Sequence, residues 1–142
     1  MFPSKNITIF ALLFSTFLFL PGCGGDRPKT VKVSGKIEFK GFNIPDKGGF
    51  LYFAPVNSGM KRPTASPFDK NGNFQVSTYE KNDGLIPGVY KITLECLEHE
   101  ISEENPIPRN LFPEKYTLPT ETPLEITVVP GKEQFFNLVV EK

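Results

Sequence analysis

The feature that most constrains this chain is a period-two alternation of apolar and polar residues that begins at residue 30. Val31, Val33, Gly35, Ile37 and Phe39 fall on one parity, and Lys32, Ser34, Lys36, Glu38 and Lys40 fall on the other. Successive side chains of a strand point to opposite faces, so this pattern predicts a half-buried strand. No helical period follows, and 14 prolines and 12 glycines in 142 residues are too many for a helical protein.

Further strand-like segments follow the first and are separated by turn-forming residues. They span residues 50–54, 64–68, 74–78, 89–97, 124–129 and 134–140. The segment 50–54 is apolar on both parities, so we expect a central strand covered on both faces. Asn71-Gly72 predicts a hairpin, because both residues tolerate positive φ. Together the segments predict an all-β fold, a seven-stranded antiparallel Greek-key β-sandwich that follows an N-terminal signal segment.

The first 22 residues have a different character. Residues 7–20 carry no charge, and as a helix they would span about 21 Å, which is short of the roughly 30 Å hydrocarbon core of a bilayer. A secretory signal is therefore expected rather than a transmembrane helix. Leu20-Pro21-Gly22-Cys23 resembles the lipobox of bacterial lipoproteins, although Pro21 departs from the usual small residue.

This resemblance implies a lipoprotein signal peptide over residues 1–22 and a lipid attached to Cys23. Residues 23–29 are then expected to form a flexible tether. Two or three acyl chains hold a protein firmly on a membrane, whereas a single chain anchors it weakly. The expected location is the cell envelope, at the outer membrane or its periplasmic face. The alternative is an ordinary signal peptide with a chance cysteine.

The charges of the chain cancel, with 16 Lys and Arg against 16 Asp and Glu. Binding to nucleic acid depends on an excess of basic residues, so no nucleic-acid partner is expected. Lys32, Lys36 and Lys40 form a basic stripe on the outer face of the first strand. We interpret these lysines as protection of an exposed sheet edge, in preference to contacts with lipid headgroups.

Four motifs occur in order along the mature chain and carry a family resemblance. They are Val-Ser-Gly-Lys-Ile at 33–37, the apolar strand that ends at Pro55, Asp-Lys-Asn-Gly-Asn-Phe at 69–74, and Ile-Pro-Gly-Val-Tyr-Lys-Ile at 86–92. Residues 30–142 thereby resemble carboxypeptidase regulatory-like, transthyretin-like domains, and are similar to small exported lipoproteins of planctomycete-like bacteria. The resemblance implies a prealbumin-like sandwich and brings with it no catalytic residues.

Catalytic and metal-binding patterns are weak. His99 is the sole imidazole and lies between Glu98 and Glu100, where a solvated loop histidine is expected. Cys96 shares a strand parity with apolar residues, which predicts a buried small hydrophobe rather than a reactive thiol. The acidic loop and the Asp69 turn lack a calcium-loop template. We therefore expect no enzyme, no metal and no cofactor, with a hydrolase as a remote alternative.

Residues 98–123 form one irregular region with five prolines. A loop of this length is either functional or an ordered arm laid over the sandwich. Its residues Leu111, Phe112 and Tyr116 are the predicted contact surface, since aromatic residues in a long loop are candidates for recognition. The sequence thus favours a lipid-anchored, non-catalytic interaction or structural module of the envelope with an unidentified protein or glycan partner. The alternative is a carbohydrate- or peptide-binding envelope protein that uses this Pro-rich arm.

Overall fold

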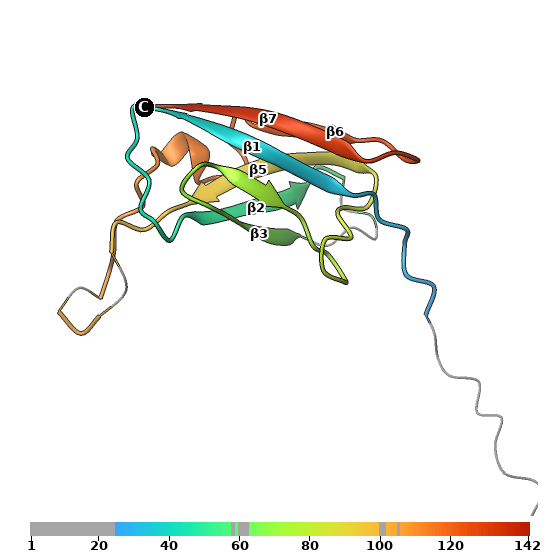
Figure 1. The fold of residues 1–142 in the computed structure, drawn as a ribbon, viewed down its shortest axis with the longest axis horizontal. Helices are drawn as coiled ribbons and strands as arrows, with labels where there is room; N and C mark the ends of the chain where they lie inside the picture. Colours follow the sequence, from blue (N-terminus) through green and yellow to red (C-terminus); the bar gives the residue numbers. More distant parts are fainter. Residues whose placement is uncertain (1–24, 58, 60–62, 100–101, 105) are drawn as a thin grey trace, which may run out of the picture.

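The computed structural model describes residues 25–57, 59, 63–99, 102–104 and 106–142. Within them the chain forms seven strands and one short 3-10 helix (Figure 1). These elements are β1 (Val33–Lys40), β2 (Gly49–Pro55), β3 (Thr64–Phe68), β4 (Asn73–Gln75), β5 (Gly88–Glu95), η1 (Glu114–Tyr116), β6 (Glu125–Val128) and β7 (Gln134–Glu141). Each predicted strand overlaps one of them, and the prediction of an all-β chain is confirmed.

The strands lie in one sheet in the order β6-β5-β2-β3-β4-β1-β7. Neighbouring strands are antiparallel except for β1 and β7, which pair in parallel along their whole length. The sheet curls into a nearly barrel-like body, so that β6 and β7, its two ends, lie on the same side of the molecule (Figure 1). The sheet is therefore mixed, whereas the sequence pattern predicted an antiparallel one.

The turn between β6 and β7 leads the chain from β6 to β7, which pairs with β1 and not with β6. The Gln134 side chain accepts a hydrogen bond from the backbone N–H of Val129 at 3.2 Å and donates one to its carbonyl at 2.8 Å. An amide side chain thus satisfies the backbone groups that the returning strand would otherwise pair with. The backbone N–H of Gln134 donates instead to the carbonyl of Lys32 at 3.0 Å, which starts the parallel ladder with β1.

The core lies between the inner faces of the curled sheet and is formed by one cluster of buried side chains. Every member of that cluster comes from residues 33–140. The largest fully buried side chains are Tyr90, Phe53, Ile37, Leu51, Leu85, Ile92 and Leu94. Residues 25–142 therefore contain the complete described core and form a unit able to fold by itself.

The β3–β4 hairpin confirms one predicted turn and refines its geometry. The Asp69 carboxylate accepts hydrogen bonds from the backbone N–H groups of Asn71 and Asn73, each at 2.9 Å. Gly72 alone adopts positive φ, at 83°, so the turn is not one in which Asn71 is also left-handed. A Cβ on Gly72 would lie 2.1 Å from the carbonyl oxygen of Ile37, which requires glycine at this close approach.

The sheet order overturns the interpretation of the lysine stripe. β1 lies between β4 and β7, so it is not an edge strand. Lys32, Lys36 and Lys40 therefore guard no open edge. Of these lysines, Lys40 forms an ion pair with Glu141 on β7 at 2.8 Å.

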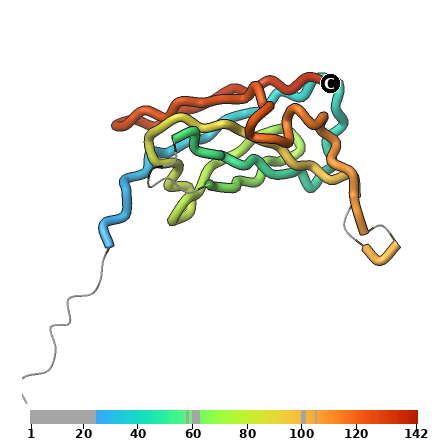
Figure 2. The backbone as a smooth tube through the Cα atoms, turned by 180° about the vertical axis from the view of Figure 1, so that it is seen from behind, coloured from blue at the N-terminus to red at the C-terminus, as the bar shows by residue number. Residues whose placement is uncertain are grey.

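The second half of the Pro-rich region is an ordered arm that completes the edge of β5. β6 pairs with β5 only as far as Lys91. Beyond that point the Thr122 hydroxyl donates to the carbonyl of Ile92 at 2.6 Å, and the Asn110 side-chain amide donates to the carbonyl of Leu94 at 3.1 Å. The same amide accepts from the backbone N–H of Cys96 at 3.1 Å. Two side chains of the arm thus take the place of a longer strand. Figure 2 traces the backbone of this arm in orange.

Candidate contact surfaces

The predicted contact residues lie inside the protein. Phe112 and Tyr116 are each only 4% exposed, and Leu111 is half-buried against the core. The Phe112 ring lies 5.7 Å from that of Phe39 and 5.2 Å from that of Phe42, measured between centroids. The prediction that Leu111, Phe112 and Tyr116 form a contact surface is therefore wrong, because the arm that completes β5 turns these side chains inward.

Tyr116 also has a structural hydrogen bond. Its hydroxyl accepts the backbone N–H of Glu141 at 3.1 Å, which joins η1 to the end of β7. The Tyr116 ring lies 4.9 Å from the Lys115 ammonium. The arm presents Ile107 to solvent instead, at its outer end.

Cys23 and the signal segment 1–22 lie outside the described residues, as does the first part of the tether. The described part of the tether touches the domain at Arg27. The Arg27 guanidinium lies 5.7 Å from the centroid of the Tyr79 ring. Val31 and Leu85 exchange two backbone hydrogen bonds, at 2.8 and 3.0 Å. The chain thus contacts the domain at Arg27 and joins it by backbone hydrogen bonds at Val31.

An exposed aromatic pair lies on the outer face of β2. Phe50 is 46% exposed and Tyr52 is 39% exposed, and their ring centroids are 6.5 Å apart. We call this the β2 aromatic face and define it by Phe50, Tyr52, Ala65, Pro67 and Glu95. Phe50 lies opposite Pro67 on β3 and Glu95 on β5, while Tyr52 lies opposite Ala65 on β3. Side chains of β3 on this face are short, so they leave both rings accessible.

The acidic side of this face interacts with the phenol. The Tyr52 hydroxyl donates a hydrogen bond to the Glu95 carboxylate at 3.2 Å. Burial, and after it the negative charge and hydrogen bond of Glu95, raise the pKa of Tyr52 above its ordinary value. Further along β5, Lys91 forms an ion pair with Glu125 of β6 at 3.1 Å. The face therefore joins an apolar aromatic surface to a row of charged groups.

The sequence predicted the position of β2 but not its open face. The strand is central, between β5 and β3, as expected. Leu51 and Phe53 point into the core, whereas Phe50 and Tyr52 point to solvent, so the prediction that both faces are covered is wrong. A strand that is apolar on both parities is consistent with two covered faces, and equally with one covered face and one contact face.

Cys96 and His99 belong neither to the predicted contact residues of the arm nor to the β2 aromatic face. Cys96 is buried, as predicted, and its thiol donates to the carbonyl of Gly48 at 3.3 Å. Burial raises the pKa of Cys96, and the charge of Lys47 offsets this only in part. His99 is half-buried, and its Nε2 is enclosed with no hydrogen-bond partner in the described structure, which differs from the expected solvated side chain. Among the described residues, no three His, Cys, Asp or Glu side chains gather as metal ligands would.

No protein-family model, curated protein or solved structure matches this chain. In the part of the chain that the structure describes, no helix is long and apolar enough to cross a bilayer.

Proposed function

We propose that this protein is a lipid-anchored, non-catalytic β-sandwich of the bacterial cell envelope that binds a partner protein through the β2 aromatic face. The single observation that carries the binding role is the Phe50–Tyr52 pair, exposed on the outer face of a central strand. Aromatic residues are enriched at interfaces, where their large rings supply contact area at little cost in conformational entropy. The anchoring role is supported by the uncharged leader and by the lipobox-like segment that ends at Cys23.

Two features support the Greek-key sandwich within this proposal. The order β5-β2-β3-β4 places a fourth strand beside the first of three consecutive ones, which is the Greek-key order. Tyr90, near the start of β5, donates its hydroxyl proton to the carbonyl of Ile86 at 2.7 Å. A tyrosine bonded to the backbone a few residues upstream is a hallmark of Greek-key sandwiches. Both features favour the carboxypeptidase regulatory-like, transthyretin-like resemblance.

The non-catalytic part of the proposal is supported by the state of the candidate nucleophile. A reactive cysteine needs a lowered pKa and an accessible sulfur. The Cys96 thiol is buried, its pKa is raised, and its proton is directed at the carbonyl of Gly48. The thiolate form is thus disfavoured, and we expect Cys96 to react with an alkylating reagent only when the protein unfolds.

The anchor is tested by fractionation of cells that express the Cys23→Ser variant. Lipid attachment requires the cysteine thiol, so this variant should leave the membrane pellet and appear in the soluble fraction after export. The wild-type chain in the same strain is the control. Unchanged sedimentation with the membrane would contradict lipidation at Cys23.

The contact face is tested by photo-crosslinking in intact envelopes. A photoreactive amino acid at Ala65, an exposed position opposite Tyr52, should yield a specific adduct. The same amino acid at Asn137, which is exposed on β7, is the matched control. Mass spectrometry of the adduct identifies the partner and tells a protein from a glycan. Equal labelling from Ala65 and Asn137 would refute a partner at the β2 aromatic face.

A further inference from the structure

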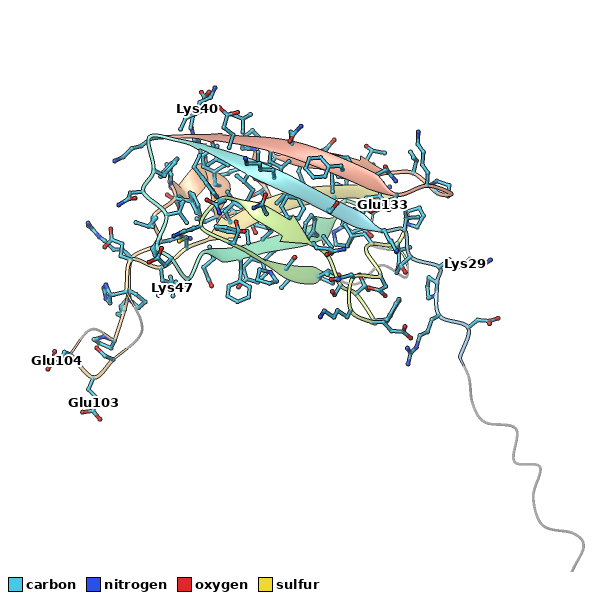
Figure 3. All side chains as sticks on the ribbon, viewed as in Figure 1. Lys29, Lys40, Lys47, Glu103, Glu104 and Glu133 are labelled. Carbon is cyan, nitrogen blue, oxygen red and sulfur yellow. The ribbon has the colours of Figure 1, made fainter. Side chains whose placement is uncertain are left out.

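A lysine-bordered hollow lies where the chain enters the domain. Its volume is about 360 Å³, and it opens to solvent between the entering segment and the turn from β6 to β7. We call it the entry hollow, and its lining residues are Lys29, Thr30, Val31, Lys32, Pro87, Pro130, Gly131, Lys132 and Glu133. Figure 3 shows Lys29 at this end of the domain, while Lys40 and Lys47 lie at the opposite end.

The residues that line the entry hollow carry a net positive charge. Three lysines line it against one glutamate. Lys40, Lys70 and Lys91, elsewhere on the surface, each form an ion pair with a carboxylate. In contrast, Lys29, Lys32 and Lys132 form no ion pair within the described structure. An anion that approaches this end of the domain therefore meets three lysines that have no ion-pair partner inside the described domain.

Backbone bonds hold the two walls of the hollow together. The pair of hydrogen bonds between Val31 and Leu85 fixes the entering segment. The Gln134 side chain, besides its bonds to Val129, donates to the carbonyl of Lys132 at 3.3 Å and so fixes the turn. The bond from the N–H of Gln134 to the carbonyl of Lys32 joins the walls at 3.0 Å. The backbone of Lys32 and Lys132 is thus held in place, which lowers the entropic cost of binding.

The position of the hollow relative to Cys23 points to a membrane ligand. Lys29 is six positions after Cys23, so the two lie at most about 22 Å apart along an extended chain. Val129 is exposed at the tip of the adjoining turn and is followed by Pro130, which adds apolar surface at the same end. A domain anchored through Cys23 therefore holds its entry hollow close to the lipid headgroups.

We propose that the entry hollow binds the phosphate headgroups of anionic phospholipids in the membrane that carries the anchor, so that this end of the domain rests on the bilayer. The inference rests on the proposed attachment at Cys23 and adds an orientation to it. Each lysine close to an anionic surface strengthens binding about fivefold, so three lysines strengthen it by about a hundredfold. In this orientation the opposite end of the domain points away from the membrane.

The test measures flotation of residues 25–142 with vesicles, since this unit contains the whole described core and lacks Cys23. Vesicles of phosphatidylglycerol and phosphatidylcholine should bind the protein, vesicles of phosphatidylcholine alone should not, and raised salt should release it. The variant Lys29→Gln, Lys32→Gln, Lys132→Gln should bind the anionic vesicles about a hundredfold more weakly. Circular dichroism checks that every variant retains the wild-type fold.

The matched control removes three lysines from the opposite end, with Lys40→Gln, Lys47→Gln and Lys142→Gln. Its net charge equals that of the first variant, so near wild-type binding by the control alone supports the entry hollow as the site. Equal weakening of both variants, or no preference for anionic vesicles, overturns the proposal. Binding of inorganic phosphate without vesicle binding overturns it in favour of a small-anion site. Because the protein tested lacks Cys23, its result is independent of the fractionation test of the anchor.

Discussion

Two groups of aromatic rings in this protein have similar chemistry and opposite surroundings. The first is the aromatic cluster of Phe39, Phe42, Phe68 and Phe112, in which Phe112 is 4% exposed. The second is the β2 aromatic face, on which Phe50 is 46% exposed. Burial of a phenylalanine side chain contributes about 1.5–3 kcal/mol to folding, and an exposed ring contributes less. The cluster therefore stabilises the fold, while the exposed pair is free to serve contact with a partner.

The largest expected effect is on the cluster. Phe112→Ala should lower the free energy of unfolding by about 3–5 kcal/mol, because it removes the ring that Phe39, Phe42 and Phe68 contact. Urea unfolding followed by circular dichroism measures this loss. Phe135→Ala, at a ring that is 63% exposed, should change the same free energy by less than about 0.5 kcal/mol. Similar losses at both positions would remove the distinction between buried and exposed rings.

The next largest effect measures the contribution of the Tyr116 hydroxyl to stability, apart from that of its ring. Tyr116→Phe keeps the buried ring but removes the hydroxyl that accepts the backbone N–H of Glu141. Loss of one such hydrogen bond should cost about 1 kcal/mol in the free energy of unfolding. Denaturant titration of the variant beside wild type measures it. A cost as large as that of Phe112→Ala would mean that η1 depends on this one bond.

Substitution of the exposed pair should leave stability nearly intact and abolish partner capture. Phe50→Ser with Tyr52→Ser should lower the free energy of unfolding by no more than about 1 kcal/mol, because each ring already contacts solvent. The same double variant should lose the adduct that forms from a photoreactive group at Ala65. Retention of the full adduct would show that the rings do not contact the partner.

The smallest expected effect is on the pKa of Tyr52. The pKa of Tyr52 is raised above 10.0 by burial and then by Glu95. The folded state therefore holds this proton more tightly than the unfolded state, and its contribution to stability is present below pH 10 and lost as the pH rises through the raised pKa. Glu95→Gln should lower the pKa of Tyr52 part of the way back, because burial persists. Tyrosinate absorbance measures the shift, and Tyr52→Phe identifies the signal; an unchanged titration would mean that Glu95 has no effect on Tyr52.

The strands were predictable because their signal is local. Alternation, or for residues 50–54 a continuous apolar run, placed all seven, and the Asp69–Gly72 turn follows from adjacent residues. What stayed hidden depends on partners far along the chain. β7 pairs in parallel with β1, about a hundred residues earlier in the chain. The arm that carries Phe112 is held by bonds from Asn110 and Thr122 to the edge of β5. The periodicity of the sequence does not predict such long-range contacts.

The same reasoning explains the reversed assignment of the aromatic residues. Phe112 lies in an irregular, proline-rich segment, for which position in a loop suggests exposure. Phe50 lies in a strand that is apolar on both parities, for which composition suggests burial. Both inferences predict the exposure of a side chain from its own segment of the sequence. In the folded protein, exposure depends on which other segments cover it. Only the three-dimensional arrangement distinguishes a second covered face from a contact face.

Contacts between Leu97-Glu98 and Arg109-Asn110 have a practical consequence for engineering. The backbone N–H of Glu98 donates to the carbonyl of Arg109 at 3.0 Å, and Leu97 bridges Asn110. These contacts hold the two ends of the intervening segment on the framework, and each doubling of the length of a flexible loop costs only about 0.6 kcal/mol in closure entropy. An epitope or a fluorescent reporter grafted beside Ile107 should therefore be tolerated, which gives a site for imaging the protein in living cells.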